Sequence, residues 1–453
     1  MNLPPIARVR RRYDQPEVAD VAAEVTRAVR ESQLATRVLR GGRVAITAGS
    51  RGIAGIDRIL RAAVDAVRSL GLEPFVVAAM GSHGGGTAEG QRAMLAEFGV
   101  TEVAMGCPVR CEMETVVVGT NSFGLPIHFD QNAFDSHGII LLNRIKPHTS
   151  FTGRYESGLL KMLTIGLGKR QGAYQVHKLG LPGLKTMLPE VGAILLKRTP
   201  VALGIAILEN ASEHTAKVVA VEPEELLEVE PRLLDESREL MGRLPFDQMD
   251  VLVVGELGKN YSGTGLDPNV IGRQRVETMP DLPRPVITRL AVLDLSEETL
   301  GNALGIGLAD LTTDRLVRSI DPVPMRVNSM TTNFLTRARV PLSLPTDGDV
   351  LGACLDTCWR SSREEGRLVM IPNTLELTTL WVTRPLAPDV EAHPELEFET
   401  DFRPIPLDDD GNVRQELLFP ESVRGRRARG PARESAGPGL AISRPGGRVG
   451  SKP

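Results

Sequence analysis

The chain has 453 residues, of which 42% are hydrophobic and 24% charged, with a formal net charge of -4 and a pI near 6.1. These values are typical of a soluble globular protein, and the slight negative charge gives no general attraction to nucleic acid or to an anionic membrane. The length exceeds that of one ordinary hydrophobic core, so we expect two domains, with small molecules or proteins as partners.

The N-terminal residues, MNLPPIARVRRRYDQ, contain no apolar segment of the kind found in a signal peptide. No uninterrupted apolar run reaches the length needed to span a bilayer. We therefore expect a cytoplasmic protein that does not contact a membrane.

The four cysteines form two pairs, each separated by three residues. This spacing differs from that of the usual zinc knuckle, and a cytoplasmic chain disfavours disulfides. Reduced, partly buried thiols are expected, and a metal site shared by both pairs is the alternative. The residues are Cys107, Cys111, Cys354 and Cys358.

The first half of the chain alternates between apolar β runs and amphipathic helices, which predicts a mostly parallel sheet covered by helices. Strands are expected at 43–48, 75–80, 115–118, 125–129, 138–142, 201–208 and 217–221, and helices at 18–39, 56–70, 87–98 and 223–241.

A second alternating region follows, with strands at 249–258, 288–295 and 367–371 and helices at 297–304 and 312–319. We place the domain boundary at 244, which gives domains over 1–244 and 245–420. From 421 to 453 the chain is rich in Arg, Gly and Pro, so a disordered tail is expected. The predicted fold class is α/β, with two mostly parallel sheets flanked by helices and an active-site cleft between the domains.

Four polar side chains follow apolar β runs by a few residues: Arg51, His83, His148 and Lys259. In open parallel sheets, ligands bind beyond the carboxyl ends of the strands. The placement of these side chains therefore indicates a binding cleft.

The loop GSHGGG places His83 among four glycines, which permit close approach of the backbone to a ligand. We interpret His83 as an acid/base residue. The alternatives are a loop histidine bonded to a neighbouring carbonyl, or a phosphate loop at a helix N-terminus. The loop lacks the Lys-Ser/Thr pair of a P-loop, which argues against phosphate.

The stretch 143–177 brings His148, Lys161 and His177 within thirty residues, in a chain with only seven histidines. His148 follows Pro147 at the exit of an apolar strand, and its alternative role is that of a structural turn. Lys161 lies in SGLLKMLTIGL, where a lysine either extends to water or is held for chemistry. Ser157 is a candidate cap for the helix that carries it.

These pieces, in order, resemble the nickel-pincer lactate racemase family and its 2-hydroxy-acid racemase homologues. The resemblance rests on GSH (81–83), Pro147-His148, SGLLK (157–161) and His177, across about residues 40–180. It implies that His83 and His148 are the acid/base pair. It also implies that Lys161, in its Ser157-Gly158 context, carries a nickel-pincer nucleotide covalently through a thioamide.

The same resemblance implies that His177, sixteen residues after Lys161, ligates the nickel, which agrees with the imidazole ligands that nickel accepts. Arg51 and Lys259 are then expected to bind the substrate carboxylate. The implied activity is that of an isomerase that inverts a 2-hydroxy acid by proton-coupled hydride transfer through a 2-keto acid. Pincer-cofactor synthesis enzymes are the implied protein partners.

The sequence departs from the family pattern where an Asp-x-Thr-Arg-Pro segment is expected, since Ala48-Gly49-Ser50-Arg51-Gly52 stands there. The loop between His148 and Ser157 is about three residues longer than usual, and Gly258-Lys259-Asn260 replaces Pro-Lys-Asp. Two alternatives therefore stay open. One is a non-catalytic small-molecule binding protein on the same fold, and the other is a metal-independent hydro-lyase or isomerase that uses the same histidines.

Overall fold

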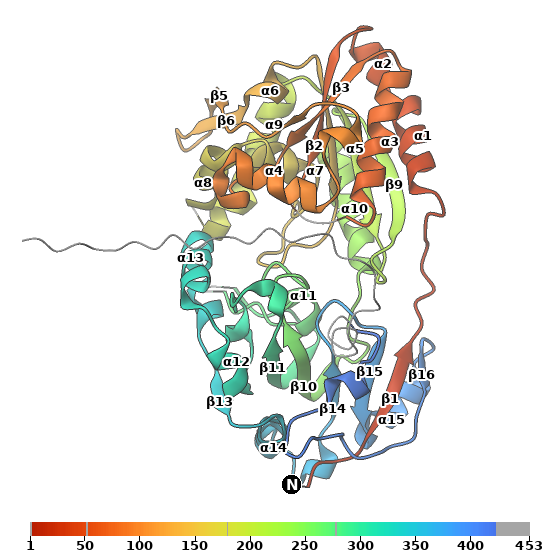
Figure 1. The fold of residues 1–453 in the computed structure, drawn as a ribbon, viewed down its shortest axis with the longest axis vertical. Helices are drawn as coiled ribbons and strands as arrows, with labels where there is room; N and C mark the ends of the chain where they lie inside the picture. The colour runs from red at the N-terminus through yellow and green to blue at the C-terminus, as the bar shows by residue number, and fades with distance from the viewer. Residues whose placement is uncertain (1, 51–52, 179, 277–278, 423–453) are drawn as a thin grey trace, which may run out of the picture.

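The computed structural model describes residues 2–50, 53–178, 180–276 and 279–422. These residues form two large β-sheets flanked by helices, which lie in the upper and lower parts of Figure 1. We call these parts the six-stranded unit and the eight-stranded unit. The arrangement confirms the predicted α/β class with mostly parallel sheets. The division into domains at residue 244 stays a prediction, and the predicted tail lies almost wholly outside the described residues.

The six-stranded unit contains a sheet of order β4-β3-β2-β7-β8-β9, in which only the β8–β9 pair is antiparallel. Alternate residues of its strands face two different cores, as Val44 and Ile46 do on one side and Ala45 on the other. The strands are β2 (Arg43–Ala48), β3 (Glu73–Ala78), β4 (Val109–Arg110), β7 (Gly138–Arg144), β8 (Val201–Glu209) and β9 (Thr215–Val221).

Helices cover both faces of this sheet, with α1 and α3 against one core and α7, α9 and α10 against the other (Figure 1). The helices are α1 (Val21–Glu31), α2 (Leu34–Arg37), α3 (Ile56–Ser69), α4 (Ala88–Glu97), α5 (Glu102–Met105), α6 (Gln131–Phe134), α7 (Leu159–Lys161), α8 (Lys169–Lys178), α9 (Gly180–Arg198) and α10 (Leu226–Leu240). Thr87 caps α4 as predicted, because its hydroxyl accepts the N–H of Gly90.

The eight-stranded unit has the order β13-β12-β11-β10-β14-β15-β1-β16. Its first five strands are parallel, and β15, β1 and β16 continue the sheet in antiparallel pairs. The strands are β1 (Ile6–Arg11), β10 (Gln248–Leu257), β11 (Val286–Leu295), β12 (Leu311–Thr313), β13 (Leu342–Leu344), β14 (Leu368–Ile371), β15 (Thr379–Thr383) and β16 (Leu396–Phe398).

Strand β1 is the N-terminal segment of the chain, yet it lies in the lower sheet beside β15 (Figure 1). The predicted grouping of residues 1–244 does not include this pairing. Ile6, Ala7 and Val9 are buried in β1, and Arg8 and Arg10, which flank Val9, form ion pairs with Glu399. Pairing with a distant strand cannot be read from local periodicity, which explains why it was not predicted.

The helices of the eight-stranded unit are mostly short, and none of the described helices of the chain is long and apolar enough to cross a membrane. They are α11 (Pro268–Ile271), α12 (Asp314–Arg318), α13 (Pro322–Thr332), α14 (Asp347–Thr357), α15 (Ala387–Ala392) and α16 (Gln415–Leu418).

Several predicted elements differ from the structure. The expected strands at 115–118 and 125–129 form a separate antiparallel hairpin, β5 (Thr115–Thr120) and β6 (Pro126–Asp130), outside the main sheets. The helix expected at 297–304 is only a 3₁₀ turn, Glu297–Thr299, because Leu300 and Gly301 take positive φ. The helix expected at 312–319 starts later, since Leu311–Thr313 form β12.

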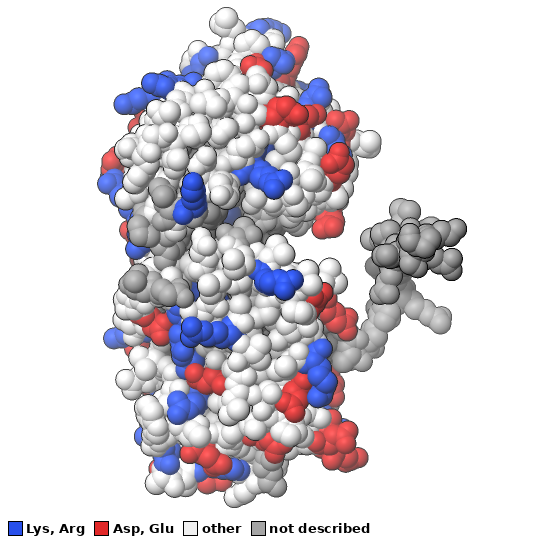
Figure 2. Space-filling model, turned by 90° about the vertical axis from the view of Figure 1, so that its left-hand side faces the viewer, with Lys and Arg blue, Asp and Glu red and all other residues white. Residues whose placement is uncertain are grey.

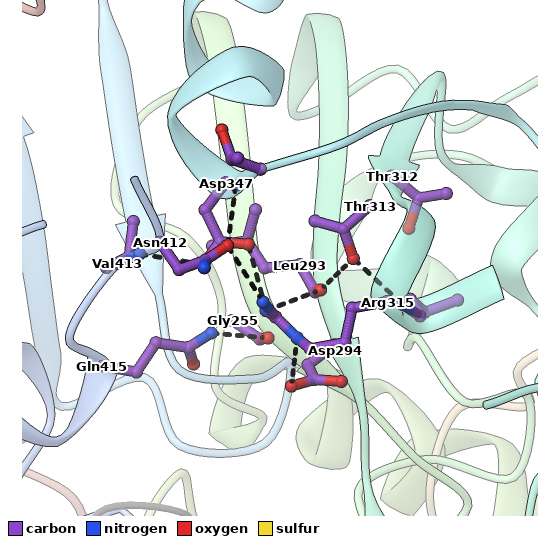
Figure 3. Close-up of polar contacts among 12 residues, drawn as sticks. Gly255, Leu293, Asp294, Thr312, Thr313, Arg315, Asp347, Asn412, Val413 and Gln415 are labelled. Carbon is purple, nitrogen blue, oxygen red and sulfur yellow. Dashed lines mark hydrogen bonds and ion pairs between the residues drawn. The ribbon is translucent and has the colours of Figure 1, made fainter. Parts of the chain in front are cut away.

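A polar network connects the C-terminal segment 412–415 to the sheet of the eight-stranded unit (Figure 3). The guanidinium of Arg315 lies between two carboxylates, with Nε 3.1 Å from Asp294 and Nη2 3.0 Å from Asp347. The second oxygen of Asp347 accepts the backbone N–H of Val413 at 2.9 Å, and Gln415 donates to Gly255 O at 3.1 Å. Both carboxylates in this network pair with Arg315, so we assign the network to stability.

We expect Asp347→Ala to lower the free energy of unfolding by about 3 kcal/mol, the lower end for a broken buried pair. Asp347 is fully buried, but the Arg315 side chain is 33% exposed and regains some hydration. Chemical denaturation measures the change. The control is Asp65→Ala, which breaks an exposed pair with Arg61 and leaves stability nearly unchanged. Equal effects of the two variants would contradict the assignment.

Candidate functional site

The segment that carries Lys161 crosses the carboxyl ends of neighbouring parallel strands. Helix α7 continues into a π-helical turn, Met162–Gly166, a form often found at functional sites. Gly81, beyond β3, donates its N–H to Gly166 O at 3.1 Å, and the amide of Asn143 in β7 donates to Gly158 O at 2.9 Å. A Cβ on Gly49, beyond β2, would lie 3.0 Å from Met162 Cε. The segment therefore contacts the ends of three adjacent strands.

Lys161 is half-buried at the start of this segment, among the buried Leu159, Leu160 and Met162. Its Nζ donates to Ser157 Oγ at 3.4 Å. Ser157 does not cap the helix as predicted, because Gly158 occupies the N-cap position and no side-chain cap bond forms there. Ser157 instead forms a β-bridge with Lys146 and lies where its hydroxyl contacts the lysine.

A buried carboxylate that the sequence prediction missed lies under the first turn of α7. Glu230 on α10 is 1% exposed, and its Oε2 accepts the N–H of Leu160 at 2.8 Å. Its Oε1 has no hydrogen-bond partner among the described residues. Burial raises the pKa of Glu230 from its ordinary 4.5 to about 7, which the helix N–H groups only partly oppose.

The signal for Glu230 was present in the spacing of its helix. The buried residues of α10 recur at helical spacing, and Glu230 falls on that face in a stretch that otherwise looks solvated. They are Leu226, Glu230, Leu233, Leu234, Ser237 and Leu240.

Glu230→Gln should remove a pH dependence of stability. Between about pH 4.5 and 7 the folded chain keeps a proton that the unfolded chain has released. The wild-type free energy of unfolding therefore falls as pH rises through this window, by at most about 1.4 kcal/mol per pH unit. The variant's stability relative to wild type should rise between pH 5 and 7 and level off above pH 8, as measured by urea unfolding. The control is Glu228→Gln, an exposed carboxylate on the same helix, for which this rise is absent.

Gly158→Ala should destabilise the start of the lysine segment by about 1–3 kcal/mol. The backbone of Gly158 is extended (φ -174°, ψ -157°) and accessible to alanine, but the added Cβ would lie 2.5 Å from Glu230 Oε1. Thermal unfolding measures the loss. The control is Gly153→Ala, where the atom nearest to the added Cβ is Tyr155 O at 3.5 Å, so no comparable loss of stability is expected. Equal stability of the two variants would show that Glu230 does not constrain this position.

His83 lies on the loop beyond β3, and this loop is hydrogen-bonded to the lysine segment through Gly81. Gly81, Gly84, Gly85 and Gly86 all take positive φ, which explains the glycine-rich sequence. The fully buried Gln91 holds the loop, since its Nε2 donates to Gly81 O at 3.0 Å and to His83 O at 3.3 Å. The imidazole of His83 is exposed.

His148 is half-buried in a tightly held loop beyond β7. The backbone N–H of His148 donates to Glu156 Oε2 at 2.6 Å, and its ring Nδ1 accepts the backbone N–H of Ser150 at 3.0 Å. Glu156 is 2% exposed and also accepts from Gly153 N and Arg238. The imidazole packs against Phe151, with ring centroids 4.5 Å apart. Glu156 therefore organises this loop, a role that the sequence prediction did not assign.

A cavity of about 600 Å³ lies between the two units, and Lys259 lines it from the end of β10. Lys259 Nζ donates to Gly263 O at 2.7 Å and to Asn328 Oδ1 at 2.8 Å. Lys146 also lines the cavity. On the face shown in Figure 2, lysine and arginine side chains lie on both sides of the junction between the units.

The opposite wall of the cavity contains an ion pair between Arg144 and Glu209, at the ends of β7 and β8. Glu209 also accepts the N–H of Ala54 at 2.8 Å, which anchors the chain just after the predicted Arg51 segment. Arg51 itself lies outside the described residues, although Ser50 lines the cavity. Pro147 lines it too, whereas His83, His148 and Lys161 are not among its lining residues.

The sequence GLGKRQG, a weak candidate nucleotide loop, has a structural role at Lys169. This lysine is fully buried, and its Nζ lies 2.9 Å from Asp130 and donates to Ala78 O at 2.7 Å. The four cysteines are buried free thiols, as expected. Burial raises the pKa of Cys354 to about 12, so that thiol stays protonated.

His177, the predicted nickel ligand, belongs to α8, but its side chain lies outside the described part of the chain. Among the described residues, no three His, Cys, Asp or Glu side chains are grouped so as to hold a metal ion.

The chain is similar to known proteins in part of its sequence and in its fold. Residues 4–185 match the family model described as lactate racemase N-terminal domain. The structure is similar to that of the lactate racemase apoprotein from Thermoanaerobacterium thermosaccharolyticum, with a TM-score of 0.50 and 10% sequence identity. The match covers 81% of this chain and 94% of that chain, and at this identity it shows a shared fold. No curated protein sequence matches the chain.

Proposed function

We propose that this chain belongs to the lactate racemase family, because its residues 4–185 match the family model of the lactate racemase N-terminal domain. The proposed activity is that of an isomerase, a racemase or epimerase of a 2-hydroxy acid. The observation that carries the proposal is the lysine segment, which places half-buried Lys161 across the carboxyl ends of three parallel strands and is bonded to the His83 loop. A ligand crevice is expected at this edge of the sheet.

The residues present fit a lysine-tethered cofactor. Lys161 is partly shielded by apolar neighbours, and its amine already contacts Ser157 Oγ. Lys161, Ser157 and Gly158 would hold a nickel-pincer nucleotide, with His177 as the protein ligand of the nickel. When bound, this group supplies hydride acceptance and return at the carbinol carbon of the substrate.

The residues of the chain would then bind the substrate and handle its protons. Lys259, held by Gly263 O and Asn328, would pair with the substrate carboxylate together with Arg51. His83 and His148 would exchange the hydroxyl proton, one for each enantiomer, since inversion requires a base in each direction. The cavity between the units would enclose the substrate and exclude water.

One observation favours a second candidate, a small-molecule binding protein without turnover. The cavity lined by Lys259 has neither His83 nor His148 among its lining residues. A ligand carboxylate bound at Lys259 and Lys146 would then be recognised but not converted. A metal-independent hydro-lyase or isomerase that uses the same histidines is a further alternative.

The deciding measurement is intact-protein mass and nickel content, on chain produced with and without the pincer-synthesis enzymes. We expect a nucleotide-sized adduct that is lost in Lys161→Arg and kept in Lys178→Arg. We also expect nickel to be lost in His177→Ala. Absence of both adduct and nickel despite active synthesis enzymes would refute the tethered-cofactor proposal.

Activity on loaded protein is then measured by chiral chromatography of a panel of 2-hydroxy acids. Removing one acid/base group in His83→Asn should lower kcat by about 10²- to 10⁴-fold. His214→Asn, a control at an exposed histidine paired with Glu17, should leave turnover unchanged. Ligand binding without inversion of any tested acid would favour the binding protein.

A further inference from the structure

A fully buried arginine of the eight-stranded unit reaches the loop that carries His148. Arg337, in the 3₁₀ turn Leu335–Ala338, is 0% exposed. Its Nε and Nη2 donate to Gln274 O at 3.0 and 2.8 Å, and these contacts fix the plane of the guanidinium. Its Nη1 donates to Ser150 Oγ at 3.1 Å. Since Ser150 follows β7 of the six-stranded unit, one side chain joins both units.

Ser150 in turn contacts the imidazole of His148. The hydroxyl of Ser150 accepts from Arg337, while its backbone N–H donates to His148 Nδ1 at 3.0 Å. Ser150 is 3% exposed, so water does not compete readily for either bond. Because Nδ1 is the acceptor, the neutral imidazole carries its proton on Nε2. Proton exchange with a ligand in this arrangement therefore takes place at Nε2.

A second contact from the eight-stranded unit supports the same loop. Asn269 Nδ2 donates to His148 O at 3.3 Å and to Asp267 Oδ1 at 3.1 Å. The backbone of His148 is thus held by Asn269 from one unit and by Glu156 from its own. Two of the contacts that hold the His148 loop, those from Arg337 and Asn269, therefore exist only while the two units are docked.

We propose that Arg337 is a positioning residue for His148, which acts through Ser150 to set the imidazole tautomer and so links docking of the two units to proton exchange. Only the statement that His148 exchanges a proton with a substrate rests on the proposed function. The tautomer itself is measurable without cofactor, substrate or turnover.

The test is ¹⁵N NMR of histidine-labelled full-length protein, with the His148 signals assigned by their loss in His148→Gln. In wild type we expect an unprotonated Nδ1 and a protonated Nε2. Ser150→Ala removes the hydroxyl that Arg337 holds but keeps the N–H, so the Nδ1 signal should move toward the average of the two tautomers. Arg337→Lys keeps a cation and should shift the signal less than Arg337→Met.

The matched control is Ser136→Ala, which removes another buried serine hydroxyl bonded within the six-stranded unit, to Ala133 O and Gly138 O. It should leave the His148 signals in place. If Arg337→Met does not fold, Ser150→Ala and Arg337→Lys decide. A wild-type Nδ1–H tautomer, or signals unchanged in both Ser150→Ala and Arg337→Lys, would overturn the proposal.

In cofactor-loaded protein that turns over, Ser150→Ala should lower kcat about ten- to a hundredfold with little change in KM, since it misplaces a reacting group and not a substrate ligand. A change confined to KM would overturn the positioning role. A further outcome is that the wild-type protein inverts no hydroxy acid while the Ser150 and Arg337 variants still shift the tautomer. That result would support the positioning role and refute the racemase function.

Discussion

The candidate site depends on one buried carboxylate. A buried carboxyl group is costly unless it forms hydrogen bonds, and the first N–H groups of a helix are donors without partners. Glu230 and α7 meet both needs, because Leu160 N–H bonds to the carboxylate under the helix that carries Lys161. Gly158 is the residue that leaves room for this contact. The SGLLK motif thus has a glycine at position 158 for a physical reason, which is the close approach of Glu230 on α10.

Around Glu230, the loops of the site are joined by backbone hydrogen bonds more than by side-chain contacts. The His83 loop is bonded through Gly81 to the π-helical turn, and the Ser157 bridge with Lys146 connects the lysine segment to the exit of β7. Such contacts bring loops of different strands to one edge of the sheet. The catalytic candidates therefore share a common scaffold, even though His83 and His148 are not among the residues that line the cavity containing Lys259.

The eight-stranded unit does more than close the cavity. Arg337 and Asn269 contact the His148 loop, and β1 crosses from the N-terminus into the lower sheet. The polar network around Arg315 fastens the C-terminal segment to the same sheet (Figure 3). This network stabilises the lower unit, while Arg337 and Asn269 connect that unit to the loop of His148, the proposed acid/base residue.

Local sequence was sufficient for most elements. Continuous apolar runs predicted β2 and β8, helical spacing of apolar residues predicted α3, and the Thr87 cap predicted the start of α4, all within about two residues. The sequence also placed His83 after β3 and His148 after β7, as the structure has them. The same reasoning assigned the 115–129 hairpin to the sheet, since an antiparallel ribbon has the same local pattern as a sheet strand.

The sequence by itself determined the α/β class, the family resemblance and the motifs that carry it, because these depend on residue type and on spacing along the chain. Only the tertiary structure decided which distant groups support those motifs. The bond of Glu230 to Leu160, the bond of Arg337 to Ser150 and the pairing of β1 with β15 are contacts between residues far apart in sequence. Such contacts arise from packing, where burial forces each polar group to find a partner, and no local pattern specifies which partner that is.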